Sequence, residues 1–310
     1  MTINDAFPIF ITHGKVDRLY ARETVAKFEE CFRTWIRPHM GTSATDGVSV
    51  LDVMSLKQAM VTKGLSVNRQ YSILVLLKIF FRFIRTVLKL PCLDPNEIRL
   101  PRRVHRRVEF LTQAEVAQLL DVIKTHTVTG LRMRALVEVL LGTGMRISET
   151  LSLNRDSISR ETGEADIVGK GNKQRTVFFS AACIAWIDRY LATRKDECPA
   201  IFVTTGANPV RLSRDDMSKA FMRLRERSGI NKKLTPHLLR HTFCTSLLHG
   251  GADITFIKEL AGHQDIQTTA RYYLGTDKDS LRAVLKRTNA HGWGVGATAT
   301  RTPSTVGAPA

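Results

Sequence analysis

The side chains best suited to chemistry in this sequence are two arginines, two or three histidines and a tyrosine, all after residue 140. The arginines are Arg146 and Arg240, the histidines are His237, His241 and His263, and the tyrosine is Tyr272 or Tyr273. Arginine binds phosphate oxygens through paired N–H groups, and histidine exchanges protons near neutral pH. A tyrosine hydroxyl can attack phosphorus and hold it covalently. This inventory suits transfer of a phosphodiester without a metal ion.

The residues around these side chains carry weaker signals. The glycine turn before Arg146 allows a close approach of backbone to phosphate, and Glu149 three residues later is placed to orient a catalytic group. Lys170 lies in a glycine-rich turn. Taken singly, each feature is explained as well by an ordinary turn, a helix cap or core packing. Their joint order and spacing favour a site.

A zinc site is the competing interpretation of the two histidines on one predicted helix. His237 and His241 are four residues apart, which is half of a helical zinc motif. The metalloprotease form needs a glutamate after the first histidine, where this sequence has Leu238, and no third ligand is evident nearby. We therefore expect neither a metal nor another cofactor.

The charge of the chain points to a polyanionic partner. The 310 residues carry a formal net charge of +17, and the sequence pI is near 10.0. Residues 1–108 hold 18 Lys and Arg against 9 Asp and Glu, and the remainder holds 28 against 20. Because both parts are basic, both are expected to touch nucleic acid. A general solubility charge is the alternative.

The elements that must position these residues begin with a helical N-terminal part. Periodic apolar residues predict helices at 20–36, 50–62 and 68–90, with a loop at 41–47. The third predicted helix also carries four basic residues on one face, at positions i, i+4, i+7 and i+11. This basic ridge suits contact with a phosphate backbone. Its members are Lys78, Arg82, Arg85 and Lys89. A merely solvated face is the alternative, and the absence of interleaved acids favours DNA.

A proline-broken, arginine-rich stretch follows and predicts an exposed linker at about 99–107. Its arginines are further candidates for DNA binding: Arg102, Arg103, Arg106 and Arg107. We therefore expect a helical domain at 1–107 and a second domain at 108–290. Residues 291–310 are rich in Gly, Ala, Thr, Ser and Pro and predict a disordered tail.

The second domain is predicted to be mainly α-helical with a small β-sheet. Thr112 and Glu115 form a capping box, and the buried helix 131–141 stops at Gly142. Residues 166–179 are predicted to form two short strands around a glycine-rich turn. Thr235 and Pro236 begin the helix that carries His237. The other predicted helices are 147–153, 181–194, 214–228, 253–260, 267–273 and 277–288.

Several classes of protein are excluded by composition. The longest apolar run, 73–81, is interrupted by Lys78, so no membrane span is expected. The N-terminus lacks the features of a secretory signal. Five cysteines without CxxC spacing favour a reducing cytoplasm.

Four strings of this sequence resemble the tyrosine recombinases, in particular Xer recombinases and the integrases of phages and transposons. They are Gly142–Glu149, Gly169–Arg175, Thr235–Thr245 and Leu260–Tyr272. The resemblance covers about 111–288, and the nine-residue step from His263 selects Tyr272 over Tyr273. Leu238 replaces an often polar residue. The N-terminal part resembles the helical core-binding domain more weakly. With no room before residue 10 for an arm-binding domain, a compact Xer-like or Cre-like organisation is expected.

The resemblance implies a role for each residue. Tyr272 attacks the scissile phosphate and forms a 3′-phosphotyrosine, Lys170 is the general acid, and no ATP is needed. The phosphate is neutralised or contacted by Arg146, Arg240 and His263, with His237 assisting proton removal and Glu149 in support.

The implied partners are double-stranded DNA with paired recombination sites, further copies of the chain in a tetramer, and an accessory DNA-bending protein or partner recombinase. The setting would be a bacterial cytoplasm and nucleoid, or a phage or mobile element. A type IB-like topoisomerase and a non-catalytic DNA-binding regulator are the alternatives.

Overall fold

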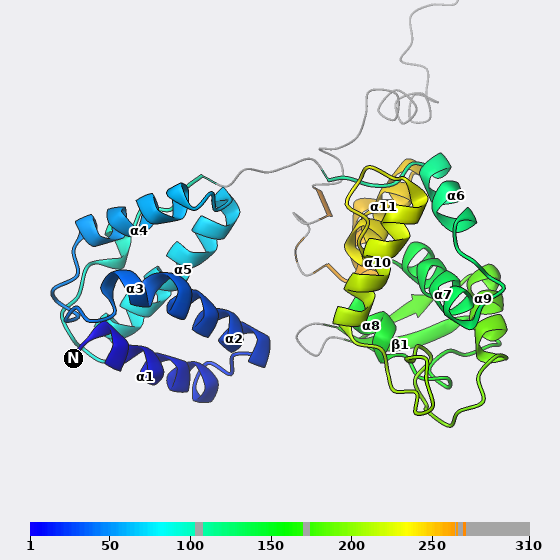
Figure 1. Cartoon of the computed structure of the whole chain (residues 1–310), viewed down its shortest axis with the longest axis horizontal. Coiled ribbons are helices and arrows are strands. Elements are labelled where there is room, and N and C mark those ends of the chain that lie inside the picture. The colour runs from blue at the N-terminus through cyan, green and yellow to red at the C-terminus, as the bar shows by residue number, and fades with distance from the viewer. Residues whose placement is uncertain (103–107, 170–173, 264, 266–268, 271–310) are drawn as a thin grey trace, which may run out of the picture. The chain divides into compact units, whose positions relative to one another are not determined.

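A computed structural model describes residues 1–102, 108–169, 174–263, 265 and 269–270. The chain divides into two compact units, Met1–Arg106 and Arg107–Ala310 (Figure 1). The predicted helices at 267–273 and 277–288, the tail at 291–310 and the turn residues 170–173 lie largely or wholly outside the described residues. Each unit is described by itself below.

The regular elements of the first unit are all helical in its described part, and one isolated β-bridge joins Thr2 to Ala44. Its elements are α1 (Ile3–Val16), α2 (Arg22–Cys31), the π-helical turn η1 (Phe32–Ile36), α3 (Arg37–Met40), α4 (Val50–Thr62), α5 (Val67–Thr86) and the 3₁₀ turn η2 (Pro95–Glu97). The predicted bounds of α4 are confirmed to the residue. Helix α1 was not predicted. It begins at a capping box, in which the backbone N–H of Thr2 donates to Asp5 at 3.0 Å.

Aromatic side chains join α1 to the rest of this unit. Phe7 of α1 stacks on Phe32 with ring centroids 3.7 Å apart, and it meets Phe80 of α5 edge-on at 5.5 Å. All three side chains are buried. Their burial supplies a core around which α5, the longest helix described, can pack.

The basic ridge differs from the prediction, because α5 ends at Thr86 rather than at residue 90. Lys89 therefore lies beyond the helix, at a backbone φ of +55°. Arg85 is exposed but donates to Asp94 at 2.8 Å, which neutralises part of its charge. Lys78 is half-buried and Arg82 is exposed. The helical ridge is thus shorter and less positive than the sequence pattern indicated.

The second unit contains seven helices and two strands in its described part. They are α6 (Gln113–Asp121), α7 (Val128–Thr143), α8 (Ile147–Ser152), β1 (Glu164–Val168), β2 (Gln174–Phe178), α9 (Ala181–Leu191), α10 (Arg214–Ser228), α11 (Pro236–His249) and α12 (Ile254–Ala261). The capping box at Thr112 and the start of α11 at Thr235 and Pro236 are confirmed. So is the fold class, mainly α with a small sheet.

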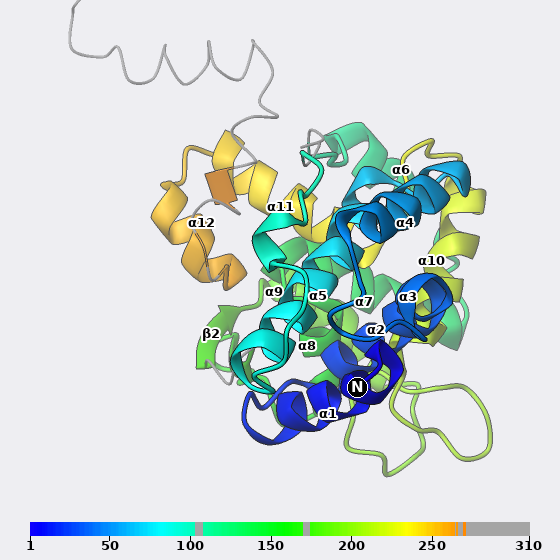
Figure 2. The ribbon, with the colours of Figure 1, turned by 90° about the vertical axis from the view of Figure 1, so that its left-hand side faces the viewer.

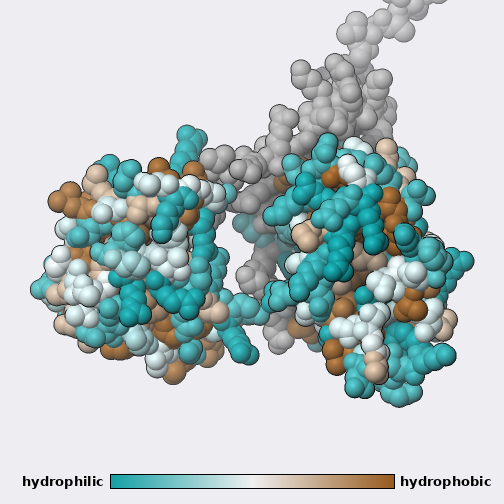
Figure 3. Space-filling view, viewed as in Figure 1, coloured by the Kyte–Doolittle hydropathy of each residue, from teal (hydrophilic) through white to brown (hydrophobic). Residues whose placement is uncertain are grey.

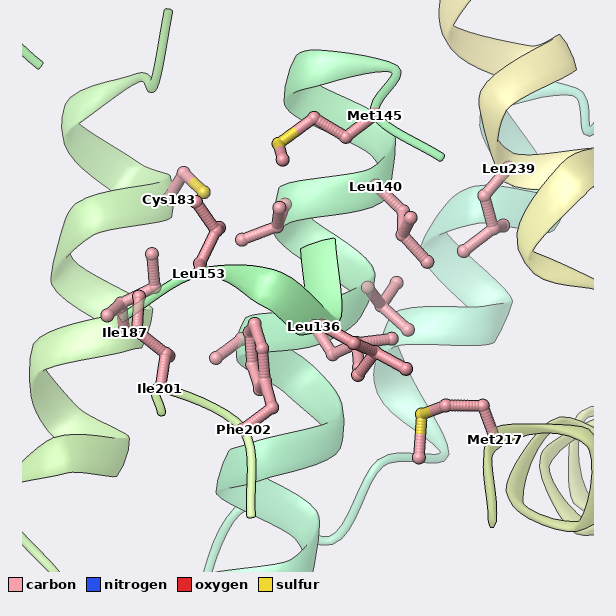
Figure 4. Close-up of a cluster of buried hydrophobic side chains, with 14 of the residues drawn as sticks. Leu136, Leu140, Met145, Leu153, Cys183, Ile187, Ile201, Phe202, Met217 and Leu239 are labelled. Atoms are coloured by element: carbon pink, nitrogen blue, oxygen red, sulfur yellow. The ribbon is translucent and has the colours of Figure 1, made fainter. Parts of the chain in front are cut away.

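Helix α7 forms the centre of this unit and packs between α9 and α11 (Figure 1). Figure 4 shows its residues Leu136 and Leu140 between Ile187 of α9 and Leu239 of α11. All four side chains are fully buried. This apolar core fixes α11, and with it His237 and Arg240.

The predicted end of α7 at Gly142 is wrong. Gly142 is exposed and lies inside the helix, which ends at Thr143 with Gly144 as its left-handed cap at φ +61°. A Cβ on Gly144 would stand 2.2 Å from the ring of Phe243 on α11. Glycine is therefore required at this position both for the turn and for the close approach of α11.

The two strands form the predicted hairpin. They are antiparallel, with Glu164 opposite Phe178 and Val168 opposite Gln174. Alternation along β2 places Arg175 and Val177 on its inner face. Figure 2 shows β2 beside α12, and the two elements are in contact.

Among the helices of the described part, none combines the length and apolar character needed to cross a bilayer. On the face shown in Figure 3, hydrophilic residues cover most of both units and hydrophobic ones form small separate groups.

Candidate active site

Arg146 is held at the start of α8 by three contacts. It is the N-cap residue, and its backbone N–H donates to Glu149 Oε2 at 2.7 Å. Its Nη1 donates to Glu149 Oε1 at 2.8 Å, and its Nη2 donates to the carbonyl oxygen of Gly262 at 2.7 Å. The side chain keeps 31% of its surface exposed. The guanidinium is thus fixed but still reachable from solvent.

Glu149 is a buried carboxylate shared by two arginines. Only 4% of its side chain is exposed, and Arg175 of β2 donates to both of its oxygens at 3.1 and 3.0 Å. Burial opposes ionisation, but the hydrogen bonds from Arg175 and Arg146 outweigh it and hold the pKa of Glu149 below its usual value. The group is therefore an anion at neutral pH.

Arg240 lies on α11 and is almost completely buried, with 2% exposed. Its guanidinium donates to two main-chain carbonyl oxygens, those of Gly144 and Ala261. These carbonyls belong to the cap of α7 and the end of α12. Three segments far apart in the sequence therefore meet at this one side chain.

Three histidines gather around the two arginines. The rings of His237 and His241, one turn apart on α11, have centroids 4.2 Å apart, and Nδ1 of His263 lies 2.9 Å from Thr269 Oγ1. Burial first, and then the nearby arginines, lower the pKa of His263 to about 3 and that of His237 below its usual value. Burial and the charge of His237 lower the pKa of His241 to about 4. All three are uncharged at neutral pH.

The site opens into a cavity of about 700 Å³ between the hairpin and α12. Arg146, Arg175 and His263 line it together with Gly262. Phe178 and Phe256 also line it, and both are more than half exposed. A cavity with cationic and neutral imidazole groups at one side is suited to an anionic ligand.

The structure brings five of the sequence-predicted residues into one unit: Arg146, Glu149, His237, Arg240 and His263. Lys170, Tyr272, Arg103, Arg106 and Arg107 lie outside the described residues. The remaining candidates belong to the first unit: Lys78, Arg82, Arg85, Lys89 and the exposed Arg102. No cluster of three potential metal ligands occurs in the part of the chain that the structure describes.

Arg175 is the residue that sequence reasoning missed. It was grouped with the hairpin and given no role. The signal that could have found it is the alternation of side chains along β2. Arg175 lies on the same face as the apolar Val177, and a charged side chain on a buried face needs an anion as its partner.

Comparison with known proteins identifies the family of this chain. The model of the phage integrase family matches residues 109–279. The tyrosine recombinase XerD of Lacticaseibacillus casei is 30% identical over 292 residues, which are 91% of this chain and 98% of that protein. XerD of Corynebacterium glutamicum is 41% identical over 186 residues, 57% of this chain and 60% of that protein.

Solved structures show the same fold. The integrase of transposon Tn1549, determined in complex with transposon right end DNA, has a TM-score of 0.77 at 22% identity. The match covers 94% of this chain and all of that one. The chain belongs to the phage integrase family. It is a tyrosine-type site-specific recombinase, an enzyme that breaks and rejoins DNA strands.

Proposed function

We propose that Tyr272 is the nucleophile and that Arg146 and Arg240 bind the scissile phosphate. The observation that carries this assignment is the anchoring of both guanidiniums by carbonyl oxygens of Gly144, Ala261 and Gly262. Donors fixed before the reaction stabilise charge that develops on the phosphate without reorganising. Arg146 and Arg175 share the one buried carboxylate of Glu149, and Arg240 is held by carbonyl oxygens instead, so the three arginines leave a net positive charge for the phosphate.

The proposed reaction is an in-line displacement at phosphorus. The Tyr272 oxygen forms a bond to phosphorus while the bond to the 5′ oxygen breaks, which leaves a 3′-phosphotyrosine and a 5′-hydroxyl. Lys170 donates the proton to the leaving oxygen, and His237 accepts the proton of the tyrosine. His237 is suited to this because its lowered pKa keeps it neutral and able to accept. His263 hydrogen-bonds the phosphate.

The substrate of this reaction is double-stranded DNA with paired recombination sites. Support comes from the charge of +17, from the Tn1549 integrase bound to transposon DNA and from a lambda integrase dimer bound to a core site. We assign the first unit to the helical core-binding domain, with Lys78, Arg82, Arg85, Lys89 and the arginines of 99–107 contacting phosphates. Four copies would form the synapse in the bacterial cytoplasm, on a mobile element or replicon, with accessory proteins as partners.

The test is to trap the intermediate. Full-length protein is mixed with a nicked duplex that carries the inverted repeats flanking the gene, so that cleavage releases a short strand and religation stops. A covalent protein–DNA band is the expected result. Its absence, despite specific binding, would indicate a non-catalytic regulator, and relaxation of supercoiled plasmids lacking the repeats would indicate a topoisomerase.

A further inference from the structure

We propose that Arg175 is a positioning residue for the phosphate site, which acts through Glu149 to hold Arg146 in its binding orientation. This inference rests on the proposed function, because it requires that Arg146 contact the scissile phosphate. Arg175 comes from β2, whereas Glu149 and Arg146 come from α8. The hairpin would thereby take part in setting the geometry of the reaction.

The hydrogen bonds of Glu149 are divided evenly between the two arginines. Its Oε1 accepts from Nη1 of Arg146 at 2.8 Å and from Nη1 of Arg175 at 3.1 Å. Its Oε2 accepts from the backbone N–H of Arg146 at 2.7 Å and from Nη2 of Arg175 at 3.0 Å. The planar guanidinium of Arg175 binds both oxygens of the carboxylate. Glu149 therefore cannot rotate without losing hydrogen bonds to one of the two arginines.

The second effect of Arg175 is electrostatic. Glu149 is only 4% exposed, so its charge is poorly screened by water. If Arg146 were its only cationic partner, the carboxylate would neutralise the charge that the phosphate needs. With Arg175 present, two cations share one anion, and positive charge remains at the more exposed Arg146.

Gly262 lies against both arginines. Its carbonyl oxygen accepts from Arg146, and a Cβ at this residue would stand 2.5 Å from Nη1 of Arg175. The guanidinium of Arg175 therefore lies directly against the main chain that anchors Arg146. Nε of Arg175 is buried and has no hydrogen-bond partner in the described part of the chain. The polar contacts of this guanidinium are thus directed to Glu149.

A purely structural role is the competing explanation, in which Arg175 only ties β2 to α8. The two roles differ in how the effects of mutations combine. A structural tie weakens the fold regardless of what stands at position 146. A positioning residue loses its effect on the reaction when the side chain that it positions has been removed.

The experiment is a double-mutant cycle in the full-length chain, read out as single-turnover cleavage of the nicked inverted-repeat duplex at saturating enzyme. The variants are Arg175→Met, Arg146→Ala and the two combined. We expect Arg175→Met to slow cleavage on the order of 100-fold with little change in DNA affinity. In the Arg146→Ala background the same change should cause no further loss. Arg175→Lys, which keeps the charge without the fork, should restore part of the rate.

The outcomes separate the two proposals. If Arg146→Ala cleaves at the unaltered rate, the proposed role of Arg146 fails, and the inference fails with it. If Arg146→Ala is slow but the two losses multiply in the combined variant, only the inference is overturned. If Arg175→Met does not fold, Arg175→Lys is measured instead, alone and combined with Arg146→Ala. Losses of cleavage rate that multiply in that combined variant would overturn the inference.

Discussion

The carbonyl oxygen of Gly262 accepts a hydrogen bond of 2.7 Å from Nη2 of Arg146, although 116 positions separate the two residues. Gly262 is the left-handed cap of α12, at φ +65°. The end of one short helix thus orients the side chain that begins another. The orientation of Arg146 therefore depends on this backbone contact as well as on its hydrogen bonds with Glu149.

Replacing Gly262 by alanine should therefore impair catalysis as well as stability. The left-handed backbone alone costs a non-glycine residue about 1–2 kcal/mol, and the new Cβ would also displace Arg175. Gly229→Ala is a matched control, because Gly229 has the same φ of +65° but its nearest neighbour, Gln118 Nε2, is 3.8 Å from the Cβ position. Melting temperatures and cleavage rates are measured for both. Equal cleavage by the two variants would contradict the importance of this contact.

Tyr272→Phe should abolish covalent attachment to DNA and leave DNA binding nearly intact. The hydroxyl is the proposed nucleophile, whereas the phosphate contacts lie elsewhere. Trapping on the nicked duplex and a gel-shift titration measure the two properties. Tyr273→Phe is the control and should keep attachment. The opposite result for the two variants would exchange their roles.

Strand cleavage should proceed in the presence of EDTA. Arg146, Arg240 and Lys170 are proposed to supply the positive charge that a metal ion provides in other phosphoryl-transfer enzymes. Cleavage rates are compared with and without chelator. A loss of cleavage in EDTA that added magnesium reverses would show that the proposed charge is insufficient.

The stability of the protein should fall as the pH is lowered below about 6.5. The pKa of His263 is lowered from 6.5 to about 3 and that of His241 to about 4. Between the folded and the unfolded pKa values, the unfolded chain binds protons that the folded chain does not. The stabilisation that the neutral histidines provide is therefore complete above pH 6.5 and is lost as the pH falls toward about 3. Each histidine contributes at most about 1.4 kcal/mol per pH unit.

Urea unfolding at a series of pH values tests this expectation, with His263→Gln as the comparison. The variant should show a shallower dependence of unfolding free energy on pH, because it lacks one of the groups that titrate. A slope identical to that of the unaltered protein would exclude His263 as a contributor.

Arg82 and Arg85 should differ in their contribution to DNA binding. Arg82→Gln should weaken binding and reduce the slope of log affinity against log salt by about 1. Arg85→Gln should have a smaller effect, because Arg85 already pairs with Asp94 at 2.8 Å. Salt titrations of the two variants measure the slopes. A larger change for Arg85→Gln would indicate that Asp94 releases it on DNA.

Local signals explain which elements the sequence could predict. The bounds of α4 and the start of α11 were predicted correctly, because apolar spacing and a capping residue are set by neighbours along the chain. Helix α1 has the same features, a cap at Thr2 and apolar residues at helical spacing. They were missed because they begin at the first residues and surround Pro8, which lies inside the helix.

Contacts across long sequence separations explain what could not be predicted. Helix α7 is capped by Gly144 rather than by Gly142, and the ring of Phe243, on another helix, leaves room for hydrogen alone at that cap. Arg175 reaches Glu149 across 26 positions, and only the packing of the hairpin against α8 and α12 reveals the pair. The types of the site residues were readable from sequence, whereas the partners that orient them depend on tertiary structure.

The anchoring of Arg146 and Arg240 by main-chain oxygens has a consequence for how such an enzyme can evolve. Every amino acid supplies the same carbonyl group, so substitutions at the acceptor positions leave the anchors in place. At Ala261 the side chain can change only as far as its buried surroundings allow, whereas a Cβ at Gly144 or Gly262 would collide with Phe243 or Arg175, respectively. Side chains on the exposed face of α12 can therefore change without removing the acceptors that hold Arg146 and Arg240.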